Sequence, residues 1–210
     1  YIYPYPHVDA LPAIMSDETS GILPYLDIPF QHAHPDVLRA MARPAKQDKV
    51  LERIHKWRQD CPNLSIRSTF IVGYPGESEE QFQYLLDWIA EAGIDRAGCF
   101  QYEPVVGAAS NELPGQVPDE IKEERWHRFM QTQQQISAQR LAARVGQNLN
   151  VIVDSIDGDV AIARGPGDAP EIDGHIEVDF VEGTDVGDII EVEITGSSDY
   201  DLQADFIRRL

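Results

Sequence analysis

Short apolar runs alternate with longer amphipathic stretches in the first half of the chain. The short runs predict buried strands, at Tyr1–Tyr5, Tyr25–Ile28, Leu64–Val72 and Arg96–Tyr102. The stretches between them predict helices, at Val8–Met15, from Asp36 to about Gln59 with a break near Pro44, and at Ser78–Ala92. Near-continuous apolar strands that alternate with helices are typical of an α/β fold with a parallel sheet.

The pattern changes after a long amphipathic helix that we expect over Val117–Val145. Acidic residues crowd its first turns, while Arg140 and Arg144 lie in its last turns, which complements the helix dipole. Beyond it, short strand-like segments follow one another without a helix, at Leu149–Ile156, Val160–Ala163, His175–Phe180 and Asp188–Thr195. This pattern predicts a small antiparallel β-barrel. We therefore expect two domains, residues 1–143 and 144–210.

The chain is strongly acidic. Its 210 residues contain 17 Lys and Arg against 36 Asp and Glu, a formal net charge of −19. Residues 144–210 hold 4 basic and 16 acidic residues, a net of −12, which leaves −7 for the remainder. Such a charge disfavours binding to the nucleic-acid backbone. It indicates either simple solubility or a basic partner.

Neither a membrane nor a secretory pathway is indicated. No apolar run approaches the roughly 20 residues of a membrane-spanning helix, and no signal-peptide pattern is present. The chain does not begin with Met, so we expect it to be part of a longer protein. Cys61 and Cys99 are too few to hold an iron–sulfur cluster, and they fit reduced core thiols of a cytoplasmic protein.

A candidate ligand site lies where three predicted strands end, at Gln31, Gly73 and Tyr102. The carboxyl ends of parallel strands share one edge, so these turns are expected to form one rim. Free N–H groups of the turn at Gly73 could hold a carboxylate or a ribose hydroxyl, although such glycines are also typical of purely structural turns. Arg67 lies inside an apolar strand, where a buried charge needs an anionic partner unless it reaches solvent at an edge.

Metal and nucleophilic chemistry have little support. His32 and His34 have no third ligand nearby in the sequence, and we expect no metal site. No sequence context supports a Ser-His-Asp arrangement. We assign no catalytic residue.

Five segments resemble the radical S-adenosylmethionine methylthiotransferases: Tyr3–His7, Pro24–Ala33, Leu38–Pro44, Arg67–Glu77 and Asp168–Gly174. The chain is most similar to the branch of this family that modifies an aspartate of small-subunit ribosomal protein S twelve. The resemblance implies that residues 1–143 form the later strands of a partial (β/α) barrel with a long linker helix. It implies that residues 144–210 form a TRAM domain.

The resemblance also implies a reaction and its cofactors. The family uses S-adenosylmethionine and two 4Fe-4S clusters to place a methylthio group on the β-carbon of the aspartate. The cysteines that hold both clusters are absent here, so we expect the chain to be inactive alone. Glu103 departs from the family, in which we expect a small hydroxyl residue. The implied cofactor-binding residues are Gln31, Arg67, Thr69, Gly73 and Tyr102, and the implied substrate-binding residues are Asp168, Glu171 and Asp173.

The expected partner is therefore a basic ribosomal protein, free or on the small subunit. The acidic TRAM domain would attract it, whereas a tRNA-modifying relative is expected to carry a basic face there. Two alternatives stay open. One is a tRNA methylthiotransferase with the same chemistry, and the other is a non-enzymatic module that binds the substrate.

Overall fold

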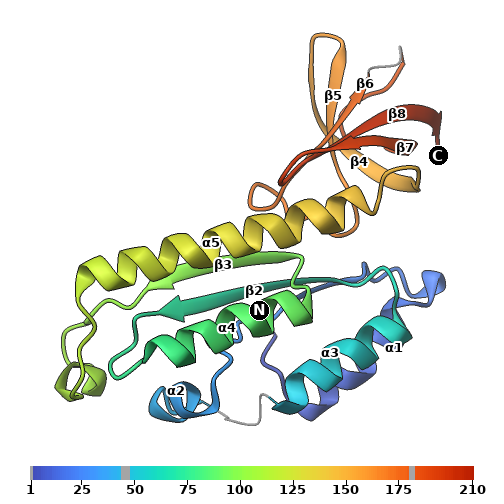
Figure 1. Cartoon of the computed structure of the whole chain (residues 1–210). Helices are drawn as coiled ribbons and strands as arrows, with labels where there is room; N and C mark the ends of the chain where they lie inside the picture. The colour runs from blue at the N-terminus through green and yellow to red at the C-terminus, as the bar shows by residue number, and fades with distance from the viewer. Residues whose placement is uncertain (1, 44–47, 180–182) are drawn as a thin grey trace. The chain divides into compact units, whose positions relative to one another are not determined.

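The structure is a computed structural model that describes residues 2–43, 48–179 and 183–210 (Figure 1). The chain forms two compact units, one of residues 1–22 and 26–133, the other of residues 23–25 and 134–210. A long helix, α5 (Asp119–Ala142), runs from the first unit into the second. The predicted boundary between residues 143 and 144 stays a prediction, because the division by contacts falls inside this helix.

The first unit is built on a parallel sheet with the strand order β1-β2-β3. Its strands are β1 (Tyr25–Asp27), β2 (Ser65–Val72) and β3 (Arg96–Gln101). Its helices are η1 (Pro6–Ala10), α1 (Leu11–Met15), η2 (Glu18–Ser20), α2 (Pro35–Ala40), α3 (Asp48–Asp60), α4 (Glu79–Ala92) and η3 (Ala109–Glu112). Strands and helices alternate along this unit, which confirms the predicted α/β class.

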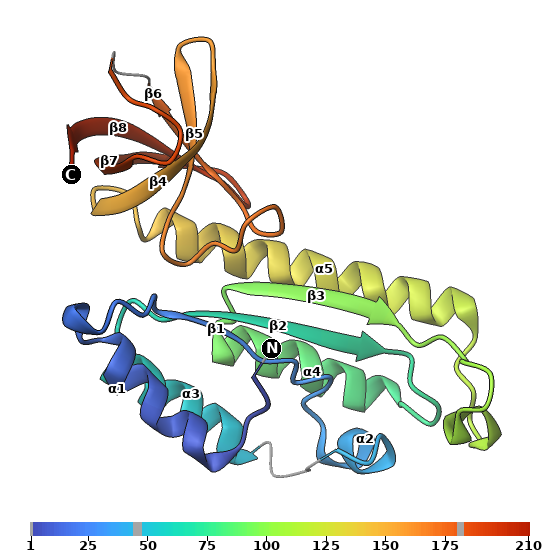
Figure 2. The same cartoon turned by 180° about the vertical axis from the view of Figure 1, so that it is seen from behind.

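Helices cover one face of the sheet. Along β2 the even-numbered residues from Ile66 to Val72 are buried, whereas Arg67, Thr69 and Ile71 are only partly buried. Phe70 packs against Trp88 of α4 and Phe129 of α5, with ring centroids 6.2 and 5.3 Å apart. The alternation of side chains along a strand therefore places Arg67 and Thr69 on the opposite face, which no helix of the described residues covers. Figure 2 views the sheet from the other side, with β1 and β2 in front of α4.

Two predictions for the first unit need correction. The strand predicted at Tyr1–Tyr5 is wrong for residues 2–5, which form no strand, and Tyr1 lies outside the described residues. Only the N–H of Ile2 bonds to β1, at the carbonyl of Asp27, because Pro4 and Pro6 have no N–H to continue a ladder. The helix predicted from Asp36 to Gln59 is two helices, α2 and α3; Pro44, where a break was predicted, lies outside the described residues.

The second unit is a closed barrel with the strand order β4-β5-β6-β8-β7. Its strands are β4 (Asn148–Asp157), β5 (Val160–Arg164), β6 (Ile176–Asp179), β7 (Ile189–Ser197) and β8 (Leu202–Arg209). Alternate residues fill its interior, among them Val151, Val153, Ala163, Ile176, Val192 and Leu202. This confirms the predicted small barrel.

The strand β8 was not predicted, although it closes the barrel. Its inward residues, Leu202 and Ala204, alternate with Gln203 and Asp205, and one small Ala gives a weak hydrophobic signal. It pairs antiparallel with β7 but parallel with β6, so the barrel is not purely antiparallel as predicted. Phe180, at the end of the predicted strand His175–Phe180, lies outside the described residues.

Candidate functional site

The uncovered face of the sheet carries an ion pair between neighbouring strands. Nη1 of Arg67 on β2 lies 3.0 Å from Oδ2 of Asp27 on β1, and both side chains are less than one fifth exposed. This confirms that Arg67 has an anionic partner. The other carboxylate oxygen, Oδ1 of Asp27, is buried and accepts no hydrogen bond from any described residue. A buried acceptor without a donor is costly, so this oxygen is a natural place for a ligand donor.

Gln31 lies just beyond β1 with an unusual backbone. Its φ of 69° is in the left-handed region, which few residues other than glycine adopt. Two hydrogen bonds to β2 hold it there: its N–H donates to the carbonyl of Thr69 at 2.9 Å, and its carbonyl accepts from the N–H of Ile71 at 2.8 Å. Its side-chain amide makes no hydrogen bond to any residue that the structure describes. The amide is therefore available to a ligand beyond the end of β1.

The glycine turn after β2 satisfies its own N–H groups. The Glu77 carboxylate accepts from the N–H of Gly73 at 2.6 Å and from that of Tyr74 at 3.1 Å. The N–H of Gly76 donates to the carbonyl of Gly115. The expectation that this turn offers free N–H groups is therefore wrong. Gly73 is required for another reason, because its φ is 74° and an added Cβ would lie 2.4 Å from Cγ of Lys122.

Glu77 is the most deeply buried carboxylate near the strand ends. Its side chain is 0% exposed, and Oε1 lies 3.3 Å from Nη1 of Arg125, which is itself 6% exposed. The same guanidinium donates to the backbone carbonyl of Glu77 at 3.1 Å. Burial raises the pKa of Glu77 to about 7, although Arg125 and the bonds from Tyr74 and Gly73 oppose the shift. This pair ties α5 to the turn after β2.

Tyr102 is used in packing at the carboxyl end of β3. It is buried and meets Tyr74 edge to face, with ring centroids 5.2 Å apart. Its hydroxyl lies 2.8 Å from Oγ of Ser110 and 3.1 Å from Oδ1 of Asn111. The structure thus separates the cofactor candidates. Arg67 and Thr69 share the open face, Gln31 is hydrogen-bonded to β2 just beyond the end of β1, and Gly73 and Tyr102 belong to a packed turn region. Arg67 and Thr69 lie within β2 rather than at its end, which corrects the predicted rim.

The two histidines after β1 shape their own turn. Nδ1 of His32 accepts from the N–H of His34 at 2.9 Å, and Nδ1 of His34 accepts from the N–H of Asp36 at 3.2 Å. Burial lowers the pKa of His32 to about 3, so it is neutral. No group of three potential metal ligands occurs among the described residues, and Cys61 and Cys99 are buried free thiols. The residues present therefore do not fit an iron–sulfur cluster.

The three predicted substrate-binding residues lie in one loop of the barrel, between β5 and β6. Asp168 accepts from the N–H of Gly165 at 3.2 Å, and Asp173 accepts from the N–H of Ala169 at 2.9 Å. Both carboxylates thus cap their own loop. Glu171 is exposed, with a φ of 62°.

Reasoning from the sequence missed Asp27, Glu77 and Arg125. Asp27 was detectable, because it is the acidic residue of the strand next to Arg67. Glu77 and Arg125 lie 48 positions apart, and no local pattern links them.

Comparison with known proteins agrees with this architecture. Residues 11–89 match the radical SAM superfamily and residues 145–207 match the TRAM domain. The "Ribosomal protein uS12 methylthiotransferase RimO" of Bordetella pertussis is 57% identical over 202 residues, which cover 96% of this chain and 46% of that protein. The protein of the same name from Saccharophagus degradans is 59% identical over 202 residues, covering 96% and 42%. The one from Acinetobacter baumannii strain AYE is 57% identical over 212 residues, covering 99% and 47%.

These matches define the class: a radical SAM domain is followed in the same chain by a TRAM domain. This superfamily implies S-adenosylmethionine and 4Fe-4S clusters as cofactors. Over nearly its whole length the sequence is similar to a part of the proteins named RimO. The chain spans about half the length of the curated relatives it matches, 46% of the Bordetella pertussis protein. No helix in the described ranges is long and apolar enough to cross a membrane.

Proposed function

We propose that this chain is the C-terminal part of an enzyme that methylthiolates the β-carbon of an aspartate in ribosomal protein uS12. The observation that carries the proposal is the open sheet face with the Asp27–Arg67 pair, beside the strained Gln31, in a chain 57% identical to a protein named as a uS12 methylthiotransferase. An unsatisfied buried acceptor beside a strained residue is typical of a site preorganised for a ligand.

The open face suits S-adenosylmethionine. Oδ1 of Asp27 would accept a hydrogen bond from the ammonium group or a ribose hydroxyl, and the Gln31 amide can donate or accept. Arg67 would hold the Asp27 carboxylate in place. When bound, S-adenosylmethionine would supply radical chemistry for removing a hydrogen atom from the target aspartate, and Asp27 and Gln31 would hold it in place. Gly73 and Tyr102 would act indirectly, through the turns that they stabilise.

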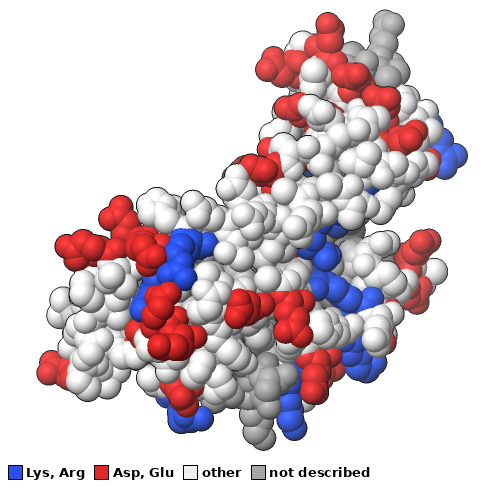
Figure 3. Space-filling view, in the orientation of Figure 1, with Lys and Arg blue, Asp and Glu red and all other residues white. Residues whose placement is uncertain are grey.

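The barrel is proposed to receive the basic ribosomal protein. Residues 144–210 carry a net charge of −12. In Figure 3, Asp and Glu side chains spread over the visible face of the barrel, whereas Lys and Arg are confined to its margin. Opposite charges speed encounter with a basic protein and repel tRNA. Glu171 is the exposed carboxylate of the predicted set, whereas Asp168 and Asp173 would shape the loop that presents it.

Cofactor binding can be tested by titrating S-adenosylmethionine into the 210-residue chain in a calorimeter. We expect Asp27→Asn and Gln31→Asn to weaken binding at least tenfold. Asn tolerates the left-handed backbone of residue 31 but shortens the amide by one methylene. Asp36→Asn, at an exposed carboxylate paired with Arg39, is the matched control. Equal affinity for all variants would refute the assignment of the open face.

Substrate choice can be tested by measuring binding of purified uS12 and of tRNA to the chain across a salt series. We expect uS12 to bind more tightly and to weaken as salt rises. Tighter binding of tRNA would favour the tRNA-modifying alternative. The whole protein, reconstituted with its clusters, should add one methylthio group to an aspartate of uS12. Binding of uS12 without any modification would favour the non-enzymatic module.

A further inference from the structure

The outer edge of β3 has no partner strand in the described part of the chain. It is the last strand in the order β1-β2-β3. The N–H of Tyr102 donates to the carbonyl of Val72 on β2, and Gln101 is the register partner of Val72. In a parallel ladder this pattern turns the N–H and the carbonyl of Gln101 away from β2. Every second residue does the same, so the peptide groups of Ala97 and Cys99 also face outward.

One point of this edge is already covered. The indole Nε1 of Trp126, on α5, donates to the outward carbonyl of Cys99 at 2.9 Å. No such cover is present at Gln101 among the described residues. Pro104 follows shortly afterwards and has no N–H to offer. The available edge is therefore short and centred on Gln101, between the Trp126 ring and Pro104.

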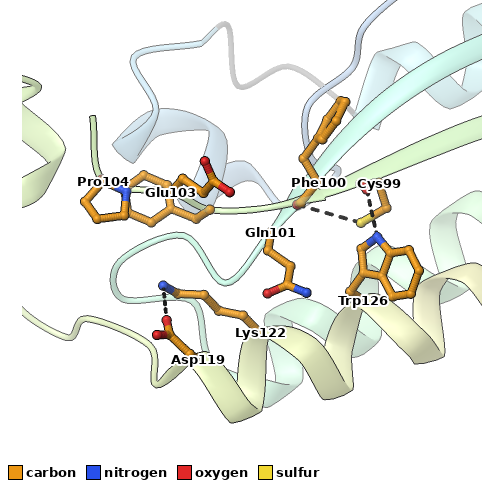
Figure 4. A pocket seen from close by; sticks show the side chains of 9 residues that line it. Cys99, Phe100, Gln101, Glu103, Pro104, Asp119, Lys122 and Trp126 are labelled. Atoms are coloured by element: carbon orange, nitrogen blue, oxygen red, sulfur yellow. Dashed lines mark hydrogen bonds and ion pairs between the residues drawn. The ribbon is translucent and has the colours of Figure 1, made fainter. Parts of the chain in front are cut away.

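This edge opens into a groove of about 890 Å³, which we call the β3 groove. Its walls include Gln101, Glu103, Asp119, Lys122 and Trp126. In Figure 4 the Gln101 side chain points toward α5, while Phe100 points away from it. Phe100 is 65% exposed, which is unusual for a large aromatic residue. The strand thus presents free peptide groups with apolar surface on both sides, as grooves that bind extended peptides do.

The charges at the groove favour a basic occupant. Asp119 is 93% exposed, and Glu103 is exposed as well. The cation of Lys122 is 9% exposed and lies 2.9 Å from Oδ1 of Asp119, so a carboxylate of the chain already neutralises it. With Lys122 and Asp119 paired, Glu103 leaves the charged residues of the lining with a net charge of −1.

We propose that an extended basic segment of the substrate ribosomal protein binds in the β3 groove as an added strand. This proposal rests on the proposed function. An added strand alternates its side chains, so every second residue would point to the sheet face that carries Phe100, Thr69 and the Asp27–Arg67 pair. The remaining side chains would point into the groove beside Trp126. The edge of β3 would thus deliver one side chain of the substrate to the open face.

Alternation provides the sharpest test. Overlapping fluorescent peptides of uS12 are first titrated against the 210-residue chain to find the tightest one. That peptide is then made with single N-methyl groups at each successive residue. We expect methylation at alternate positions to weaken binding about tenfold, equivalent to about 1.4 kcal/mol, and methylation between them to have little effect. Uniform tolerance of N-methylation would overturn the proposal.

Paired proline substitutions test the same edge from the protein side. Gln101→Pro removes the outward N–H inside the groove, and an edge strand tolerates proline at such a position. Ala97→Pro makes the same change on the same edge, away from the residues that line the groove. We expect the first to weaken peptide binding about tenfold and the second to leave it unchanged, with similar melting temperatures. Equal effects of the two would contradict the proposal.

The outcomes separate this proposal from the proposed function. If uS12 is bound and modified but neither N-methylation of the peptide nor Gln101→Pro weakens binding, the β3 groove is not the docking site, while the proposed function stands. If uS12 is neither bound nor modified, the proposed function fails and the groove proposal fails with it. If the chain self-associates and Gln101→Pro abolishes the dimer in sedimentation, a second copy occupies the edge and the proposal is wrong.

Discussion

The turn at Gly73 allows a sharp test of the packing between β2 and α5. Gly73 and Gly76 both have positive φ, at 74° and 83°. An added Cβ at Gly76 would meet nothing within 4 Å, whereas at Gly73 it would lie 2.4 Å from Cγ and 3.2 Å from Cβ of Lys122. Alanine substitutions at these positions therefore share the same backbone cost and differ in one steric overlap.

The structure gives the magnitudes. A non-glycine residue in the left-handed region costs about 1–2 kcal/mol, which is all that Gly76→Ala should lose. Overpacking adds about 1–3 kcal/mol, so Gly73→Ala should lose roughly 3 kcal/mol or more. Lys122→Ala removes the Cγ atom at 2.4 Å and leaves only the milder contact at 3.2 Å. In that background the cost of Gly73→Ala should fall close to that of Gly76→Ala.

The assay is urea unfolding followed by tryptophan fluorescence. Trp57, Trp88 and Trp126 all lie in the first unit, so the signal reports the unit that contains the turn. Free energies for the wild type, both single variants and the double variant form a mutant cycle, which cancels the separate effect of removing the lysine charge. The packing argument is refuted if Gly73→Ala costs no more than Gly76→Ala. It is equally refuted if Lys122→Ala brings no relief.

Three further predictions concern charge and capping. Because burial raises the pKa of Glu77 to about 7 from 4.5, the folded state keeps a proton that the unfolded state has lost. The free energy of unfolding of the wild type, measured by urea denaturation, should therefore fall by about 3 kcal/mol as pH rises from about 4.5 to 7. The Glu77→Gln variant should lose much less stability over this range. The same pH dependence in both proteins would contradict the argument. Ser78→Ala removes the Oγ that accepts from the N–H of Gln81 at 3.3 Å in a capping box, and should cost about 1 kcal/mol in the same assay; no loss would show that the cap is dispensable. Asp205 and Glu193 are exposed register partners on β8 and β7, where their like charges repel each other. Asp205→Lys should therefore stabilise the barrel by about 0.5 kcal/mol, measured by thermal unfolding followed by circular dichroism. A loss of stability would contradict this argument.

Local patterns predicted most of the fold because they are strong where a side chain is buried on one face. The helix predicted at Ser78–Ala92 has a complete capping box and a glycine in the left-handed conformation at its end, both visible in the sequence. The failures occurred where the pattern does not report hydrogen bonding. Tyr1–Tyr5 looked like a strand, but two prolines in the segment prevent a ladder. Leu202–Arg209 was assigned no element, but it forms the strand that pairs with both β6 and β7.

The site was predictable only in part. Arg67 could be recognised as a buried charge from one strand alone, and its need for an anion followed from electrostatics. The identity of that anion depended on the register between β1 and β2, which no local pattern fixes. The turn at Gly73 was misinterpreted for the same reason. Its N–H groups are free only if Glu77 points elsewhere, and Glu77 is held inward by Arg125, 48 positions away.

The uncovered face links these observations to function. Parallel strands are normally covered on both faces, because their side chains are apolar on both. Here the covered face follows that rule, with Ile66, Phe70 and Val72 fully buried. The other face carries the Asp27–Arg67 ion pair together with a partly buried Ile71 and an exposed Phe100, which are register partners on β2 and β3. Removing the charges of Asp27 and Arg67 from water, with both side chains less than one fifth exposed, costs free energy that well-packed apolar side chains would avoid. A face with this composition is poorly suited to packing against a helix and well suited to a polar ligand and a side chain of a bound substrate.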